Sequence, residues 1–383
     1  MQVYPQSCIF RKLLFAIILL STGPLNLKAQ DPSFSQFYAN RMYLNPAFTG
    51  LEKGLFLNAS SRMQWLAIDK GFRTYDVNIS SQIPFAKMGV GLHLHRNIEG
   101  FAQLATTSAG LAFSYTIPGK KNNIHFGFET KISEKSIDWD KLTFTDELHP
   151  IFGIINQSTA VPVRDQVTFG DVDFGIVWRR EGDWSFGRRS FRKVRSMLGI
   201  SFHHLPYWFS NSAQGNDSFL NRDWSVAPRG TLHGGLLIPF RPVSAGGKQI
   251  LFSPNFKLDT QGYQLLDRAT NIMVGTFGAY ALLGNLYLSL FYQNRNFAPN
   301  PIHTNSLIFG SGVYIEGARS NSGETPEMFI GISFDLNSTG LGPAAGSIFE
   351  LQFTYNISKQ IFGNGKGFGS RNRNRILDCK SFF

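Results

Sequence analysis

Two histidines, His93 and His95, stand two positions apart in a stretch that alternates apolar and polar residues. Residues with this spacing point to the same face of a strand, so the two imidazoles could hold a metal ion. Val90, Leu92 and Leu94 would take the opposite face. No cysteine or acidic cluster in the sequence is visibly placed to complete a zinc-type ligand set. We therefore predict two polar residues that face an interior, and no metal site.

Three further patterns resemble known sites, and each lacks a required part. Asp138 and Asp140 begin like a calcium loop, but the glycine that such a loop requires is absent. The alternating glycines of Gly363–Gly369 resemble a phosphate cradle without its Gly-Lys-Ser/Thr ending. Ser201 and His203 share a strand face, but a hydrolase also needs a group that orients the base. We expect a solvated loop, a flexible linker and no enzyme, and we predict no cofactor and no small-molecule substrate.

The elements that would position these residues are β-strands. Alternation with a period of two residues indicates a strand, and it recurs along most of the chain. In the clearest case, Phe349, Leu351 and Phe353 alternate with Glu350 and Gln352. The pattern predicts about 14 strands, an even number, as in single-chain bacterial outer-membrane barrels. The predicted strands are Gly54–Trp65, Phe72–Ile83, Met88–Asn97, Gln103–Ile117, Ile124–Ile137, Asp171–Arg180, Val194–Pro206, Pro228–Arg241, Gln249–Thr260, Tyr263–Leu282, Leu286–Phe297, His303–Glu316, Pro326–Asn337 and Ser347–Lys359.

The lengths of the connections suggest which ends of the strands face outward. Outer-membrane barrels have short periplasmic turns and longer external loops. With the first strand starting in the periplasm, Asp138–Gly170 and Tyr207–Ala227 fall among the external loops, as their lengths require. Two predicted connections break the trend: Gln261–Gly262 is a short external one, and Arg179–Arg195 is a long periplasmic one.

The composition agrees with a transmembrane β-barrel. Charged residues make up 16% of the chain and aromatic residues 14%, whereas soluble domains carry about 25% charged residues. No segment after the first 29 residues has the uninterrupted apolar run of ~18 residues that a membrane-spanning helix needs. A barrel with apolar outward and polar inward residues averages to this composition.

The first 29 residues have the layout of a secretory signal. Arg11 and Lys12 precede the apolar run Leu13–Leu20, and Ala29 offers a small residue for cleavage. We predict that residues 1–29 are removed. The mature chain then keeps Cys379 as its single cysteine, so no intramolecular disulfide is possible.

The stretch Gln30–Gly50 is neither signal nor strand. It contains an Asn-Pro turn signal at Asn45 and Pro46, together with many large apolar side chains. We predict an N-terminal arm that packs against the barrel and plugs or seals its periplasmic end. The arm residues for which we predict contacts are Phe34, Phe37, Tyr43, Asn45, Pro46 and Phe48.

The arm also carries a family resemblance. With DPSFSQFY at 31–38 and LNPAFTG at 44–50, the chain resembles the PorP/SprF family of type IX secretion system membrane proteins. Ile137–Gly153, Met197–Pro206 and Glu327–Thr339 are similar to family segments as well. The resemblance implies an outer-membrane protein of Bacteroidetes that takes part in protein secretion and, in gliding species, in surface delivery of adhesins. It also implies a component or client-specific partner of the secretion machine that is not an enzyme.

The basic charge of the mature chain is concentrated in two segments. Arg179–Arg195 has seven basic against two acidic residues, and Lys359–Phe383 has six against one. The predicted topology puts both in the periplasm. They would contact solvent or lipid headgroups, or they would dock to an acidic periplasmic partner or to the cell wall. The basic residues predicted to contact a partner are Arg188, Arg189, Arg192, Arg371, Arg373 and Arg375.

We therefore predict a signal peptide at 1–29, an arm at 30–50, an all-β outer-membrane barrel at 51–359 and a flexible basic tail at 360–383. The barrel would lie in outer-membrane lipid and link a secreted client or adhesin to periplasmic type IX secretion proteins. A nucleic-acid partner is not expected. The alternative is an autonomous porin or small-solute channel, and an outer-membrane enzyme is third. The predicted inward faces carry few charges and many Ser, Thr, Asn and Gly residues, which favours a filled or narrow lumen over the open bore of a porin.

Overall fold

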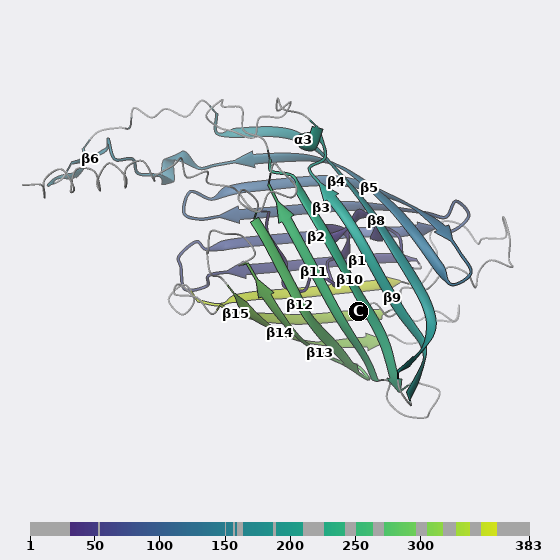
Figure 1. Cartoon of the computed structure of the whole chain (residues 1–383). Helices are drawn as coiled ribbons and strands as arrows, with labels where there is room; N and C mark the ends of the chain where they lie inside the picture. Colours follow the sequence, from purple (N-terminus) through teal and green to yellow (C-terminus); the bar gives the residue numbers. More distant parts are fainter. Residues whose placement is uncertain are drawn as a thin grey trace, which may run out of the picture. The chain divides into compact units, whose positions relative to one another are not determined.

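The computed structural model describes residues 31–52, 54–149, 151–155, 158, 164–186, 189–209, 226–241, 250–262, 272–295, 305–316, 327–337 and 346–357, with side chains left undescribed at 185–186, 189–192, 208–209, 241 and 316. The described strands form one closed antiparallel barrel of 14 strands (Figure 1). The barrel strands are β1 (Leu55–Gln64), β2 (Phe72–Ile83), β3 (Met88–Glu99), β4 (Leu104–Pro118), β5 (Asn122–Ser136), β8 (Gln166–Phe186), β9 (Arg189–His203), β10 (Arg229–Arg241), β11 (Ile250–Gln261), β12 (Ile272–Leu283), β13 (Leu286–Asn294), β14 (Ser306–Glu316), β15 (Glu327–Asn337) and β16 (Ile348–Ile357). Each pairs with its neighbour in the chain, and β1 closes the barrel against β16 with Leu55 opposite Ile357.

The barrel wall has its apolar side chains outside. On β3, Leu92 and Leu94 are 56% and 57% exposed, whereas His93 between them is 5% exposed. On β16, Leu351 is exposed and Glu350 and Gln352 are buried. In a barrel that lies in a lipid bilayer, apolar residues face outward and polar residues face inward. The described strands show this pattern. No helix among the described residues is long and apolar enough to cross a membrane.

The two ends of the barrel differ. At one end, here called the short-turn end, β2–β3, β4–β5 and β12–β13 are joined by tight turns. At the other, the long-loop end, β5 and β8 are joined by residues 137–165, which include the two-stranded sheet β6 (Leu148–His149) and β7 (Gly153–Ile154). By the usual rule the short-turn end faces the periplasm.

One of the two predicted exceptions to this rule disappears. The other cannot be assigned, because residues 263–271 of the predicted strand Tyr263–Leu282 lie outside the described residues; β11 ends at Gln261 and β12 begins at Ile272. The predicted long connection Arg179–Arg195 is wrong. β8 continues to Phe186 and β9 starts at Arg189, so this region is a strand hairpin that runs past the barrel wall.

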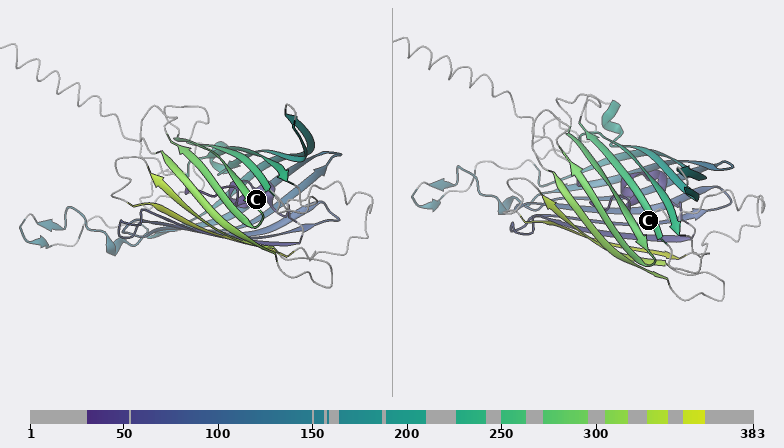
Figure 2. Two further views of the ribbon diagram at one scale, coloured as in Figure 1. Left: turned by 90° about the horizontal axis from the view of Figure 1, so that it is seen from below. Right: turned by 60° about the horizontal axis from the view of Figure 1, so that its bottom comes forward.

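The N-terminal arm lies inside the barrel lumen, where Figure 2 shows it as the purple segment. It contains a helical turn, α2 (Arg41–Leu44), and a 3₁₀ turn, η1 (Pro46–Phe48). Asn45 caps η1 by accepting a hydrogen bond from the Ala47 N–H at 2.9 Å, and the fixed φ of Pro46 suits the first position of such a turn. The predicted Asn-Pro turn is therefore present, and it sits within the lumen.

The arm runs the length of the lumen from the long-loop end to the short-turn end. Its first described residue, Asp31, donates its N–H to the side chain of Gln261 at the long-loop end of β11. At the other end, the carbonyl of Thr49 accepts a hydrogen bond from Ser114, near the short-turn end of β4. The arm thus plugs the lumen and is not confined to the periplasmic end.

Glycines on the inner wall let the arm backbone approach closely. A Cβ atom on Gly127 would lie 2.0 Å from the Ala47 nitrogen, and one on Gly175 would lie 1.9 Å from the Asn45 side-chain oxygen. Gly127 and Gly175 are direct partners across β5 and β8. Because neither glycine has a side chain, the inner wall leaves room at this position for the Asn-Pro turn of the arm.

We expect Gly175→Ala to destabilise the protein, because the added methyl group meets the Asn45 side chain. Overpacking of this kind costs about 1–3 kcal/mol. The matched control is Gly170→Ala on the same strand, where a Cβ meets nothing within 4 Å. Samples are incubated at a series of temperatures and then run on gels without boiling. The temperature at which the band of the folded form disappears should be lower for Gly175→Ala and unchanged for Gly170→Ala. Equal midpoints for the two variants would contradict the close approach of the arm.

Candidate functional site

The side of the lumen formed by β12–β15 packs aromatic rings against the arm. Tyr38 stacks on Phe291 with ring centroids 5.2 Å apart, and it lies 5.4 Å from Tyr280. Phe37 meets Phe291 edge-on at 5.6 Å. The Tyr38 hydroxyl hydrogen-bonds that of Tyr287. Aromatic pairs of this geometry add stability beyond the apolar area that they bury, so the arm forms the centre of the barrel's core.

A carboxylate pair near the closing seam of the barrel holds the start of the arm. Glu350 on β16 accepts the N–H groups of Ser35 at 2.7 Å and Gln36 at 2.9 Å. Asp335 on β15 accepts the Ser35 hydroxyl at 2.6 Å. Arg62 on β1 lies 3.3 Å from Glu350 and 3.4 Å from Asp335. Because all these groups are buried, removal of either side would leave charges without partners.

Asp31 is clamped between two cations at the long-loop end. Its carboxylate lies 2.9 Å from His204 and 3.1 Å from Arg229. Burial disfavours the charge of Asp31, but His204 and Arg229 outweigh it and hold its pKa well below the usual value. Burial also disfavours the imidazolium of His204, but Asp171 and Asp31 raise the pKa of His204 to about 10. We call Asp31, His204 and Arg229 the arm clamp.

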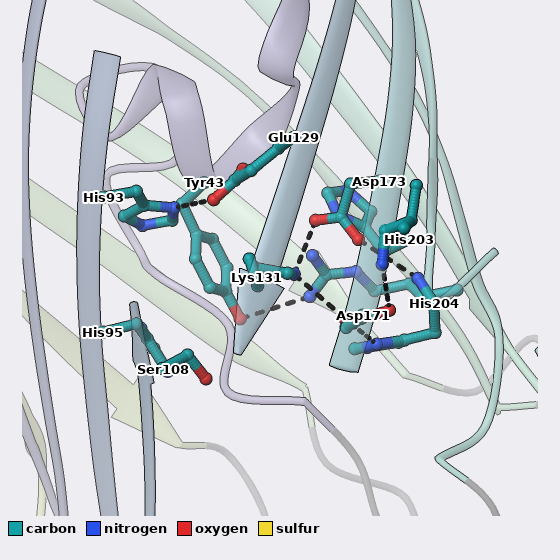
Figure 3. Close-up of polar contacts among 12 residues, drawn as sticks. Tyr43, His93, His95, Ser108, Glu129, Lys131, Asp171, Asp173, His203 and His204 are labelled. Carbon is teal, nitrogen blue, oxygen red and sulfur yellow. Dashed lines mark hydrogen bonds and ion pairs between the residues drawn. The ribbon is translucent and has the colours of Figure 1, made fainter. Parts of the chain in front are cut away.

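The predicted histidine pair faces the lumen, as expected. One ring nitrogen of His93 lies 2.7 Å from Asp76. The other lies 2.7 Å from Glu129 (Figure 3). His95 lies 3.1 Å from Asp76 and stacks on Tyr43 of the arm. The expectation that no acidic cluster is placed beside the pair is wrong, because β2 supplies Asp76 and β5, two strands away, supplies Glu129. The His93 ring thus bridges two carboxyl groups of the lumen wall.

Asp171, Asp173 and His204 place three potential metal ligands within 4.8 Å of one another. The Lys131 ammonium lies among them, 2.6 Å from Asp173 and 3.2 Å from Asp171, as Figure 3 shows. His204 also lies 2.6 Å from Asp171. The carboxylates are therefore already neutralised by protein cations, and a metal ion would have to displace Lys131.

In the structure, Asp173 lies beside His203 and could orient its ring. The sequence did not reveal this third residue beside Ser201 and His203. The His203 ring lies 3.2 Å from the Ser201 hydroxyl and 2.8 Å from Asp173. This order of groups resembles a hydrolytic triad. However, the Ser201 hydroxyl also donates to the Leu44 carbonyl of the arm at 2.7 Å, and all three side chains are buried. In this structure the three residues tether the arm.

The predicted contact residues fall into two groups. In the arm, Phe34, Phe37, Asn45, Pro46 and Phe48 are buried and Tyr43 is half-buried. They contact the barrel's own interior, so their contact with a separate protein stays a prediction. In the basic group, Arg188 and the tail residues Arg371, Arg373 and Arg375 lie outside the described residues, as does the signal segment; Arg189 and Arg192 lie on β9, with side chains undescribed.

The charges of the lumen are more numerous than predicted. We expected inward faces with few charges, but Arg62, Asp173, Lys257 and Glu350 are buried there and Lys131 is half-buried. These residues stand at the inward positions of the alternating pattern, which was the available signal. Their pairing, however, depends on the register of strands far apart in the chain.

The fold and the lumen define a class of protein: an outer-membrane-type β-barrel whose own N-terminal arm plugs it. Comparison with known families then identifies the chain. The profile of "Type IX secretion system membrane protein PorP/SprF" matches residues 26–355. The chain belongs to this family, and with its fold it is an outer-membrane component of the type IX secretion system.

Solved structures share the barrel architecture at low sequence identity. CdiB from Acinetobacter baumannii is 11% identical with a TM-score of 0.41, over 78% of this chain and 59% of CdiB. This chain thus spans less than two thirds of CdiB. A CymD monoaromatic hydrocarbon channel is 10% identical with a TM-score of 0.41, over 85% of this chain and 94% of CymD. A Pseudomonas aeruginosa FadL homologue is 10% identical with a TM-score of 0.39, over 83% of this chain and 94% of that one. No curated protein matches the sequence.

We expect Asp31→Asn to loosen the arm, because it removes one charge from the arm clamp. Charged hydrogen bonds contribute about 1.5–3 kcal/mol, so release should rise about tenfold or more. Release is measured by trypsin cleavage after Arg41, which is 5% exposed in the lumen. Ser133→Ala, which removes a lumen hydrogen bond to Ser108 outside the arm, is the control and should leave cleavage unchanged.

The clamp should also depend on pH. Asp31 contributes fully above about pH 4, its unfolded pKa, and its contribution is lost only as the pH falls through its lowered folded pKa. His204 contributes fully below about pH 6.5, and its contribution is lost as the pH rises toward the folded pKa of about 10. Trypsin itself loses activity in acid, so cleavage after Arg41 is compared at each pH with cleavage of the unfolded protein. This ratio should be low at about pH 6.5 and rise toward pH 10. A flat profile that Asp31→Asn does not alter would contradict the clamp.

Proposed function

We propose that this barrel is a non-enzymatic anchor of the type IX secretion system, which assists surface delivery of a secreted protein or adhesin and links it to the periplasmic assembly. The observation that carries this proposal is the arm, which occupies the lumen from one end to the other. A diffusion porin needs a polar bore that stays open. Here the bore is taken up by part of the chain itself, which suits an anchor better than a channel.

The position of the arm is fixed at several depths, which supports a permanent plug. Glu350 binds its start, Asn58 donates to the Ala39 carbonyl at 2.7 Å, and Ser201 donates to the Leu44 carbonyl at 2.7 Å. Asn45 donates to the backbone carbonyl of Ile200 at 3.0 Å. Each buried group left without a partner would cost about 1–3 kcal/mol, so removing the arm would be costly at many places together.

The long-loop end offers a surface for a secreted client. The β6–β7 hairpin projects away from the barrel in Figure 1 and carries Ile151 and Phe152, which are 80% and 74% exposed. Exposed apolar clusters of this kind mark contact sites with other macromolecules. Asp140, Asp146 and Glu147 add acidic charge nearby. This surface is the one we assign to the client.

Deleting the gene in the producing bacterium should abolish surface delivery of at least one secreted protein, measured by surface proteomics, and the wild-type gene should restore it. Ser201→Ala should still restore delivery, because it removes only one of several hydrogen bonds that hold the arm and an anchor needs no nucleophile. The purified barrel should give no porin-sized conductance steps in planar bilayers. Unchanged delivery after deletion, together with large steady conductance, would favour the channel alternative.

The orientation can be tested separately. An epitope tag inserted after Ile155, in the exposed loop between β7 and β8, should be reachable by antibody on intact cells. A tag inserted after Phe85, in the exposed turn between β2 and β3, should become reachable only after the outer membrane is opened. The reverse result would invert the topology.

A further inference from the structure

The strands β8 and β9 leave the barrel wall together at the short-turn end. β8 pairs with β5 as far as Arg180, opposite Asn122, and the Glu181 N–H still donates to the Lys121 carbonyl at 3.0 Å. β9 pairs with β10 as far as Arg195, opposite Leu237. Beyond these points β8 and β9 pair only with each other among the described strands. We call Gly182–Val194 the projecting hairpin; Figure 2 shows its dark teal tip parting from the wall.

The projecting hairpin has one regular edge and one irregular edge. Gly182 is opposite Val194 and Trp184 is opposite Phe191, so β9 carries an extra residue between these pairs. Lys193 at this bulge has a positive φ of 57° and donates its N–H to Asp183 at 2.9 Å. Bulges of this kind protect an edge against further pairing. The β8 edge, Gly182–Phe186, has no such protection among the described residues.

Among the described strands, none lies beside Gly182–Phe186 on the side away from β9, because β5 does not extend that far. β5 starts at Asn122, so an additional strand beside Gly182–Phe186 would follow on in line with β5. Such an edge presents unpaired N–H and C=O groups, which an extended peptide can satisfy by adding a strand. Trp184 is 45% exposed on this hairpin and offers an apolar contact.

The charge around the β8 edge indicates which kind of segment would bind there as an added strand. Arg180–Arg195 has six basic against two acidic residues, and Arg195 already neutralises Glu181 at 3.0 Å. The adjacent β4–β5 turn adds the exposed Lys120 and Lys121. A second copy of this hairpin, or the basic segment Lys359–Phe383, would meet like charge. An acidic segment would meet opposite charge, which speeds association and sets its specificity.

Lipid headgroups could also attract Trp184 and the basic residues, but the reach of the hairpin argues against them. Five strand residues span about 17 Å, whereas the headgroup layer on one side of a bilayer is only about 5–8 Å thick. Lipid also offers no peptide groups to pair with the edge.

We propose that the β8 edge Gly182–Phe186 accepts an extended, acidic segment of a periplasmic protein as an added β-strand. This rests on the proposed anchoring function and locates its periplasmic attachment. The bound segment lies beside β8 in line with β5, and its backbone pairs with the β8 edge. Its carboxylates face the basic residues, and one of its apolar side chains packs against Trp184.

The test uses a photo-crosslinking amino acid at Trp184 in cells. Phe85 is the matched control position, because it is 64% exposed at the same end of the barrel but lies on a closed turn. We expect a discrete protein adduct at Trp184 that is absent at Phe85 and is reduced at least about fivefold when Arg188, Arg189 and Arg192 are changed to Glu. Adducts with lipid alone, or equal adducts at both positions, would overturn the proposal.

Strand addition is distinguished from simple charge attraction by amide hydrogen exchange. In native outer-membrane preparations the amides of Gly182–Phe186 should exchange at least about tenfold more slowly than in the purified barrel in detergent. Equal exchange in the two preparations would overturn strand addition.

A deletion separates this proposal from the anchoring function. Glu181 and Arg195 are direct cross-strand partners, so Gly182–Val194 can be replaced by an Asn-Gly turn, which suits such a closure. We expect a folded barrel with reduced client delivery. If this variant delivers normally while deletion of the gene abolishes delivery, the edge proposal fails and the anchoring function stands. If deletion of the gene has no effect, the anchoring function fails.

Discussion

A polar group that is buried away from water must find a partner, and this requirement shapes the whole lumen. Glu350 is fully buried, and two of its partners are N–H groups of the arm. Ser35 and Gln36 are buried as well, and their N–H groups both donate to that carboxylate. The same mutual dependence links Asn58 to Ala39 and Ser201 to Leu44. Since each unmet group costs about 1–3 kcal/mol, the wall and the arm stabilise each other, and neither is a complete fold alone.

The wall of the barrel could be predicted from the sequence because lipid imposes a simple rule on each strand by itself. Alternation alone located β2 at Phe72–Ile83 and placed His93 and His95 on the inner face. The same rule failed where lipid no longer acts. Beyond Arg180 the segment is rich in charged residues and glycine, so a strand hairpin was interpreted as a loop, although Trp184 and Phe186 continue the alternation of β8. Its pairing is visible only in the register with β9.

The contents of the lumen could be predicted only in outline. The aromatic and proline content of Gln30–Gly50 indicated a packed arm, and the arm is packed. Its partners could not be inferred, because they depend on the three-dimensional closure of the barrel: Ser35 and Glu350 are 315 positions apart. The same holds for the charges. Asp76 and Glu129 flank His93 from two different strands, and neither stands near it in the sequence.

The order of the chain places a further constraint on how this barrel forms. The arm is the first described segment, and the strands that hold its start, β15 and β16, are the last. Arg62 on β1 contacts the same two carboxylates, Asp335 and Glu350, that bind Ser35. The seam where β1 meets β16 is therefore also the place where the arm is fixed. Long-range contacts of this kind form late, because the entropy of closing the chain must be lost before they form. Once they form, the bonds that hold the arm also neutralise charge on both sides of the seam, so closing the barrel and seating its plug are one event.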